Sequence, residues 1–252
     1  MILWAEQKQQ NKPMQALFGQ ARPALAHTDP DFVDIKTRLI YGEVYEQVSL
    51  DPGMRELLIL TVGIVNQTIK EVALHTSAAL HVGATPAQIK EAAYHCAPYI
   101  GVGKAEAALT AINDVLAERG ISLPLPSAST TDEQTRLEAG IAAQKAIFGA
   151  HIDAMRAAAP DDQKHLQDHL SAWCFGDTCT RAGLDAAQRE LLTFCILCAQ
   201  GGCENQLRSH INGNVAVGND KNVLIDALTV CMPYVGFPRT LNALACLNEI
   251  LP

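Results

Sequence analysis

Two copies of one unit make up most of the chain, and this internal repeat constrains the fold more than any other sequence feature. The segment Leu50–Leu58 (LDPGMRELL) recurs as Leu184–Leu192 (LDAAQRELL), and Cys96–Gly101 (CAPYIG) recurs as Cys231–Gly236 (CMPYVG). Further matches at nearly the same offset are Tyr41-Gly42 with Phe175-Gly176, His75 with His210, and Gly83 with Gly218. Because the repeated unit has about 105 residues, we expect two copies of one small fold.

The boundary between the copies is predicted from composition. Residues 120–131 read GISLPLPSASTT, and two prolines with a run of small hydroxyl residues are typical of a linker. We therefore predict a first repeat at residues 1–119 and a second at residues 132–252. A further match of residues 16–19 with residues 146–149 extends the repeat toward the N-terminus.

Each copy is predicted to be helical. Residues 55–65 are apolar almost all round, which indicates a buried helix. Residues 69–80 carry apolar side chains at helical spacing, and so do residues 85–96, whose helix we expect Pro98 and Gly101 to end. Residues 106–118 form a last amphipathic segment. Since we find no period-two strand of five or more residues, the predicted class is all-α.

Composition and charge indicate which kinds of molecule the protein is unsuited to bind. Hydrophobic residues make up 48% of the chain and aromatic residues only 5%, which predicts a packed, largely aliphatic core. The net charge is −8 and no basic block exists, so nucleic acid and anionic membrane surfaces are poor partners. The longest apolar run, residues 57–65, is far shorter than the about 20 residues of a transmembrane helix.

The N-terminus and the cysteines predict a cytoplasmic protein. The chain starts MILWAEQK, which has no basic region and turns polar after five residues, so we expect no secretory signal. Without export, most of the eight cysteines are expected to be reduced, buried and small hydrophobic groups. The cysteines are Cys96, Cys174, Cys179, Cys195, Cys198, Cys203, Cys231 and Cys246.

An acid–base set is the first candidate for chemistry. Glu71 and His75 lie four residues apart and share one helix face, where a carboxylate can hold the imidazole tautomer and raise its basicity. Glu56 begins a dry helix and needs a partner there. These residues could equally form a solvated helix pair and a carboxylate that Arg55 neutralises. The repeat favours function, because Glu56 and His75 recur as Glu190 and His210.

The thiols offer a second chemistry. Cys195 and Cys198 have the spacing of a redox motif, but they lie in an apolar helix, which favours core packing. A zinc site built from these two with Cys203 and His210 matches no known spacing, so we expect no metal. Cys203 follows two glycines near a helix start, where the helix dipole can lower the pKa of a thiol. Cys203 is therefore the candidate reactive thiol.

The order and spacing of these residues resemble the carboxymuconolactone decarboxylase family, which includes the alkylhydroperoxidase D-like peroxidases. The resemblance rests on Arg55-Glu56-Leu57-Leu58 with His75, on residues 175–192 with His210, and on Tyr99 and Tyr234 before glycines, so it covers both copies. It implies two tandem alkylhydroperoxidase D-like helical bundles. Single-copy members assemble as trimers of dimers, which implies a homotrimer, or pseudo-hexamer, for this two-copy chain.

The resemblance also implies roles for residues. Glu56 and Glu190 match the proton-relaying glutamate, and His75 and His210 match the histidine of the peroxidase branch. The peroxidase branch also carries two redox cysteines before the histidine. At these positions the first copy has Thr68 and Glu71 and the second has Cys203 and Gln206, so neither copy can form a disulfide during a two-thiol cycle. Decarboxylase-like members carry a glutamate four residues before the histidine, which only the first copy keeps, as Glu71.

Three functions remain open from the sequence. The first is a lyase or isomerase without cofactor that acts on a small carboxylated lactone or related ring compound. Its catalytic residues would be Glu56, Glu71, His75, Glu190, and His210, and Tyr99, Gln206 and Tyr234 would bind substrate. The second is a thiol peroxidase that uses Cys203 alone, and the third is a non-catalytic binder of a small ligand.

Overall fold

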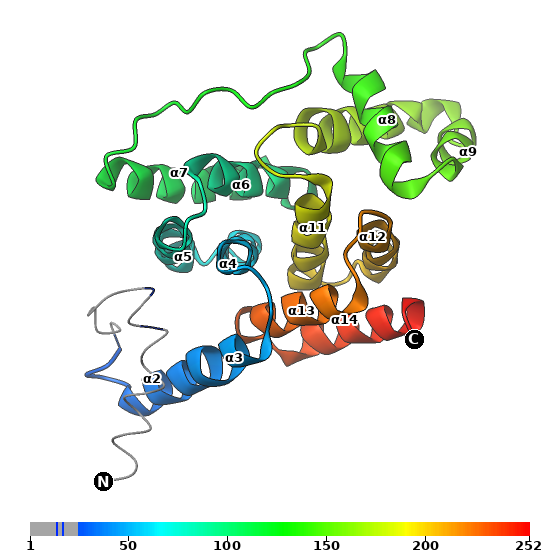
Figure 1. Ribbon diagram of the computed structural model, residues 1–252. Coiled ribbons are helices and arrows are strands. Elements are labelled where there is room, and N and C mark those ends of the chain that lie inside the picture. Colours follow the sequence, from blue (N-terminus) through cyan, green and yellow to red (C-terminus); the bar gives the residue numbers. More distant parts are fainter. Residues whose placement is uncertain (1–13, 15–16, 18–24) are drawn as a thin grey trace.

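The computed structural model describes Met14, Leu17 and residues 25–252 (Figure 1). The start of the predicted first repeat, the N-terminal segment MILWAEQK and residues 16, 18 and 19 of the upstream match lie outside the described residues. Every regular element in the described part is a helix, and no strand occurs there, which confirms the all-α prediction.

The helices of the two copies follow the same order. The first copy contains α2 (Pro30–Thr37), the π-helical η1 (Arg38–Val44), α3 (Tyr45–Gln47), α4 (Pro52–Asn66), α5 (Ile69–His81), α6 (Pro86–Ile100) and α7 (Val102–Glu118). The second contains α8 (Arg136–Phe148), α9 (His151–Ala157), η2 (Asp161–Gln163), α10 (Lys164–His169), the π-helical η3 (Leu170–Cys179), α11 (Ala186–Gln200), α12 (Glu204–Ala216), α13 (Lys221–Val235) and α14 (Phe237–Ile250). Even the irregular π-helical segments η1 and η3 occupy matching positions.

Side-chain caps explain where several helices begin. The Asp51 carboxylate accepts a hydrogen bond from the backbone N–H of Met54 at the start of α4, and Pro52 fixes the first turn. Thr85 and Gln88 form a capping box at the start of α6. These local signals set where two helices of the repeated unit begin.

The ends of two helices differ in part from the sequence expectations. α6 continues past Pro98 to Ile100 and stops at Gly101, the second of the two residues expected to end it, where φ is +88°. The missing proline N–H costs one helical hydrogen bond in the last turn, and the glycine supplies the left-handed backbone that ends the helix. The next helix, α7, begins at Val102 rather than near residue 106.

One hydrophobic core serves both copies. The helices α4 and α11 lie in the middle of the molecule and pack against each other (Figure 1). A single cluster of buried side chains joins the two, with Leu57 and Leu58 from α4 and Leu191 and Leu192 from α11. Each such side chain contributes about 1.5–3 kcal/mol when fully buried. The two repeats therefore fold around a common centre.

The N-terminal part of each repeat packs on the other repeat. η1 of the first copy contacts α13 of the second, and η3 of the second copy contacts α6 of the first. Residues 119–135 connect the copies without helix or strand and run from α7 to α8 along one edge of the molecule (Figure 1). This exchange brings side chains of both copies to each candidate site.

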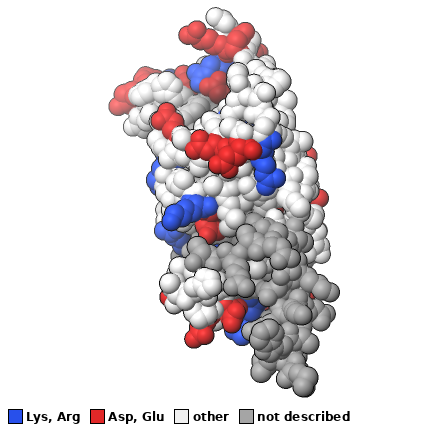
Figure 2. Space-filling view, turned by 90° about the vertical axis from the view of Figure 1, so that its left-hand side faces the viewer, with Lys and Arg blue, Asp and Glu red and all other residues white. Residues whose placement is uncertain are grey.

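The surface carries mixed charge on the face that Figure 2 shows. Lysine and arginine side chains lie in small groups close to aspartate and glutamate groups on its described part, with wide uncharged areas between them (Figure 2). None of the described helices is long and apolar enough to span a bilayer.

Candidate active site

The first candidate site is built on a buried pair of side chains from adjacent helices. Glu56 projects from α4 and His75 from α5, and 2.7 Å separates Glu56 Oε2 from His75 Nδ1. Both residues are almost fully buried, with 0% and 1% exposure. A hydrogen bond from Nδ1–H to the carboxylate fixes the ring and directs Nε2 away from Glu56.

Glu56 has further partners on its other oxygen. The Tyr45 hydroxyl donates a hydrogen bond of 2.9 Å to Glu56 Oε1, and Arg55 Nε lies 3.6 Å from the same oxygen. The Arg55 guanidinium also stacks over the Tyr45 ring, 3.8 Å from its centre. Glu56 therefore pairs with His75 and also contacts Arg55, as the neutralising interpretation expects.

Glu71 places a second carboxylate beside the His75 imidazole. Its Oε2 lies 3.5 Å from His75 Nε2, and its Oε1 lies 3.7 Å from Lys36 Nζ. Burial lowers the pKa of His75, but the hydrogen bonds to Glu56 and Glu71 outweigh it, so the pKa is raised overall. The same histidine contact lowers the pKa of Glu71. The interpretation of Glu71 and His75 as a solvated pair is wrong, because His75 is buried.

Tyr234 reaches this site from the other copy. It lies on α13, and its ring packs edge-on against the His75 ring with 5.3 Å between centres. The Tyr234 hydroxyl is buried and has no hydrogen-bond partner within the described part of the chain. Because an unpaired buried hydroxyl is costly, it marks a position where a ligand oxygen would be stabilised.

The second candidate site repeats the central pair. His210 Nδ1 on α12 lies 2.8 Å from Glu190 Oε2 on α11, and both residues are buried. Tyr99 comes from α6 of the first copy, with its ring centre 6.2 Å from that of His210, and Phe148 packs edge-on against the same imidazole at 5.2 Å. The exchange of tyrosines between copies is thus reciprocal.

The second site differs from the first around its tyrosine. Thr193 donates a hydrogen bond of 3.2 Å to the Tyr99 hydroxyl, and the Cys174 thiol donates another at 3.5 Å. Tyr99 is therefore satisfied by protein groups, whereas Tyr234 is not. Gln206 stands where the first copy has Glu71, but it is exposed and forms no hydrogen bond with described residues.

Cys203 lies at the start of α12 but not in a setting that activates a thiol. Its Sγ donates to the Leu197 carbonyl at 3.3 Å, and no hydrogen bond joins it to His210 in the part described. Burial, Glu204 and Cys246 raise the pKa of Cys203, which opposes the expected effect of the helix dipole. Cys195 and Cys198 are buried in α11 as predicted, and no cluster that could hold a metal occurs among the described residues.

His95 packs and hydrogen-bonds behind the second site. It is fully buried, and its Nε2 lies 2.8 Å from Thr193 Oγ1. Burial, followed by the positive charge of Arg189, lowers the pKa of His95 to about 3. The imidazole is therefore neutral and links α6 to α11 behind Tyr99.

A pocket of about 380 Å³ adjoins the outer side of the first site. Tyr41, Tyr45 and Arg55 form the wall that it shares with the Glu56 and His75 pair. The full lining is Leu17, Tyr41, Tyr45, Glu46, Pro52, Arg55, His81 and Val82. His75 therefore lies behind this wall rather than in open solvent.

Comparison with known proteins agrees with this duplicated arrangement. The sequence profile described as "Carboxymuconolactone decarboxylase family" matches residues 30–114 and again residues 164–249. The chain belongs to the carboxymuconolactone decarboxylase family. Each matched stretch contains one buried glutamate–histidine pair, so the tandem two-copy organisation predicted from the repeat is confirmed.

Two individual proteins that resemble the chain cover different shares of it. A 4-carboxymuconolactone decarboxylase of Acinetobacter baylyi is 28% identical over 120 residues, which is 47% of this chain and 88% of that protein. A solved structure assigned as a gamma-carboxymuconolactone decarboxylase subunit of Burkholderia xenovorans covers 96% of each chain at 21% identity, with a TM-score of 0.57. The second likeness shows that the whole fold, including both copies, occurs elsewhere.

Several side chains around the two histidines were not found from the sequence. Tyr45 hydrogen-bonds to Glu56, Phe148 packs on His210, and Cys174 hydrogen-bonds to Tyr99. Cys179 occupies the position in the second copy that Tyr45 holds in the first. The duplicated Tyr41 and Phe175 were seen only as a repeat match. The signal that could have found them is the spacing of these segments before the paired glutamates, which is similar in both copies.

Proposed function

We propose that the protein is a lyase, with decarboxylation of a small carboxylated lactone or related ring compound as its reaction, and that the first site carries it without a cofactor. The observation that supports this most is the buried His75 held between two carboxylates beside the unpaired Tyr234 hydroxyl. The relative's name, 4-carboxymuconolactone decarboxylase, supplies the substrate class.

The chemistry requires stabilisation of an oxygen and delivery of a proton. When a carboxylated butenolide loses carbon dioxide, the electron pair of the broken C–C bond passes into the ring, and the lactone oxygen gains negative charge. Nε2–H of His75 and the hydroxyl of Tyr234 can donate hydrogen bonds to that oxygen. Loss of one such donor typically costs about a hundredfold to a thousandfold in kcat.

Protonation of the ring carbon completes the reaction. The raised pKa of His75 favours the protonated imidazole, and Nε2 is the nitrogen that does not face Glu56. Glu71 contacts Nε2 and is one-third exposed, so it can return a proton from solvent after each turnover. Glu56 holds the ring and balances its charge throughout.

The second site has the same glutamate–histidine hydrogen bond, between Glu190 and His210. Its Tyr99 hydroxyl, however, is hydrogen-bonded to Thr193 and Cys174. Gln206 replaces the carboxylate that Glu71 supplies in the first site. We therefore assign the main activity to the first site. No observation favours peroxide chemistry at Cys203, whose pKa is raised.

Turnover of 4-carboxymuconolactone, followed by lactone absorbance and by carbon dioxide release, tests the proposal. His75→Gln should abolish most activity, while the matched change His210→Gln and the thiol change Cys203→Ser should leave most of it. Equal loss in Cys203→Ser would indicate peroxide chemistry instead. Tight binding without carbon dioxide release, for this and related carboxylated rings, would identify a non-catalytic binder.

A further inference from the structure

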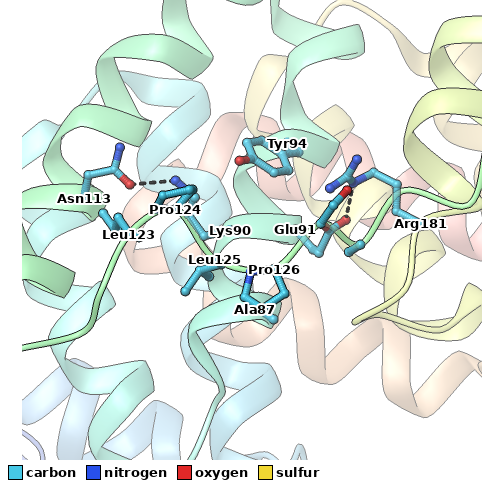
Figure 3. A pocket seen from close by; sticks show the side chains of 12 residues that line it. Ala87, Lys90, Glu91, Tyr94, Asn113, Leu123, Pro124, Leu125, Pro126 and Arg181 are labelled. Atoms are coloured by element: carbon cyan, nitrogen blue, oxygen red, sulfur yellow. Dashed lines mark hydrogen bonds and ion pairs between the residues drawn. The ribbon is translucent and has the colours of Figure 1, made fainter. Parts of the chain in front are cut away.

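A second pocket lies under the linker, away from both glutamate–histidine pairs. The linker crosses α6 and α7 and encloses about 510 Å³ with them (Figure 3). The linker contributes an apolar wall of two leucines and two prolines, Leu123 to Pro126. The facing wall comes from α6, α7 and the segment after η3, and none of its residues belongs to either candidate active site.

Two cations flank one aromatic ring on the facing wall. The Tyr94 ring centre lies 5.6 Å from Lys90 Nζ and 5.1 Å from the Arg181 guanidinium carbon (Figure 3). Lys90 Nζ donates a hydrogen bond of 2.6 Å to Asn113 Oδ1. Because Asn113 is neutral, this contact satisfies a donor but does not balance the charge of the lysine.

The one carboxylate among the described lining residues is already shared by two arginines. Glu91 is buried, and it accepts hydrogen bonds from Arg181 Nε at 2.9 Å and from Arg189 Nη2 at 3.1 Å. These three residues together carry one excess positive charge, and Lys90 adds a second. Burial lowers the pKa of Lys90, whose ammonium group forms no ion pair with the described residues. The pocket is thus positive in a chain of net charge −8.

The repeat shows that the fold does not require these cations. The positions of Lys90 and Tyr94 correspond to Ile225 and Thr229 on α13, which forms the same helix in the second copy. The position of Arg181 corresponds to Gln47 in the first copy. The charged groups therefore occur only where the linker crosses α6.

We propose that this pocket binds a small organic carboxylate with an apolar body, such as an aromatic acid. The carboxylate would contact Lys90 and the Nη groups of Arg181, which make no hydrogen bond with described residues, since Arg181 holds Glu91 through Nε. The apolar body would lie between the Tyr94 ring and the linker prolines. This arrangement pairs a desolvated anion with cations and buries apolar surface at once.

Titration of the purified protein with benzoate, followed by NMR and calorimetry, tests the proposal. Lys90→Met removes the charge and keeps the apolar stem, and it should weaken benzoate binding at least tenfold. Lys104→Met, on the exposed face of α7, is the matched control and should leave binding unchanged. Inorganic phosphate, which lacks an apolar body, should bind at least tenfold more weakly than benzoate.

A second variant keeps the test independent of any folding defect. Asn113→Asp is isosteric and places a carboxylate against Lys90, so it should also weaken benzoate binding while circular dichroism stays unchanged. Unaltered affinity in both Lys90→Met and Asn113→Asp would overturn the proposal. Binding that is kept in these variants but lost in His75→Gln would place benzoate at the active site and overturn it as well. Equal affinity for phosphate and benzoate would overturn the claim that the pocket recognises an apolar body.

Discussion

Replacement of Glu56 by glutamine should expose how strongly the buried charges of the first site depend on one another. Glu56→Gln keeps the shape of the side chain but removes its charge. The glutamine oxygen can still accept one hydrogen bond, either from Tyr45 or from His75, but not both strong bonds that the carboxylate now accepts at 2.9 and 2.7 Å. It also loses the ion pair with Arg55.

The magnitude follows from these contacts. One hydrogen bond to a charged group contributes about 1.5–3 kcal/mol, and breaking a buried ion pair costs about 3–5 kcal/mol because a charge stays buried without its partner. We therefore expect the free energy of unfolding to fall by about 3–5 kcal/mol at pH 6. The Glu190→Gln change in the second copy is the matched comparison.

The pH dependence carries the sharper test. The pKa of His75 is raised in the folded protein, so its pairing contributes stability that is fully present below the unfolded value of about 6.5. That contribution is lost as pH rises through the folded pKa of His75. The difference between parent and Glu56→Gln should therefore shrink from pH 6 to higher pH, and the His75 titration should move to lower pH.

Urea unfolding at several pH values and NMR titration of the His75 ring measure both effects. The Glu56→Gln and parent titrations must be compared at one ionic strength, although a pair this buried is little screened by salt. A stability loss that is independent of pH, together with an unchanged His75 titration, would refute the claim that Glu56 supports the charge of this imidazole.

Three further outcomes are expected. Tyr234→Phe should lower kcat about a hundredfold with little change in urea stability, because the lost hydroxyl has no partner in the described structure. An unchanged kcat, or a clear fall in the free energy of unfolding, would contradict this. Gly140→Ala should destabilise by more than about 3 kcal/mol, since its Cβ would lie 1.9 Å from the Ser171 carbonyl, whereas Gly103→Ala, with open space around it, should be tolerated. Sedimentation equilibrium should give about three times 27.1 kDa, with exposed Phe237 on α14 as part of the contact; a single species of monomer mass would reject the trimer.

The sequence was most informative where a physical pattern repeats locally. The buried helix at residues 55–65 and the caps at Asp51 and Thr85 follow from apolar periodicity and from side chains that satisfy nearby backbone groups. The i, i+4 spacing also placed Glu71 beside His75. Of the two residues expected to end α6, Gly101 does so and Pro98 does not, because a proline in the last turn loses only one helical hydrogen bond.

Which residues meet in each site could not be predicted from the sequence of one copy alone, because each site takes residues from both copies. The sequence identified Glu56, His75 and Tyr234, but nothing local shows that Tyr234 approaches the histidine of the other copy. That contact depends on how α13 packs against η1 and α4, which is a long-range property of the fold. The same holds for the wall that Tyr45 and Arg55 form beside Glu56.

The exchange of tyrosines explains a consequence of joining the two copies in one chain. Each site takes its glutamate and histidine from one copy and its tyrosine from the other, so neither copy alone holds a complete set. A covalent linker makes this pairing intramolecular, which raises the effective concentration of each copy for the other. It also allows the two sites to differ, because identical chains would be forced to supply identical residues to both. The two sites differ in this way, because the Tyr99 hydroxyl is hydrogen-bonded to Thr193, whereas the Tyr234 hydroxyl has no hydrogen-bond partner among the residues that the structure describes.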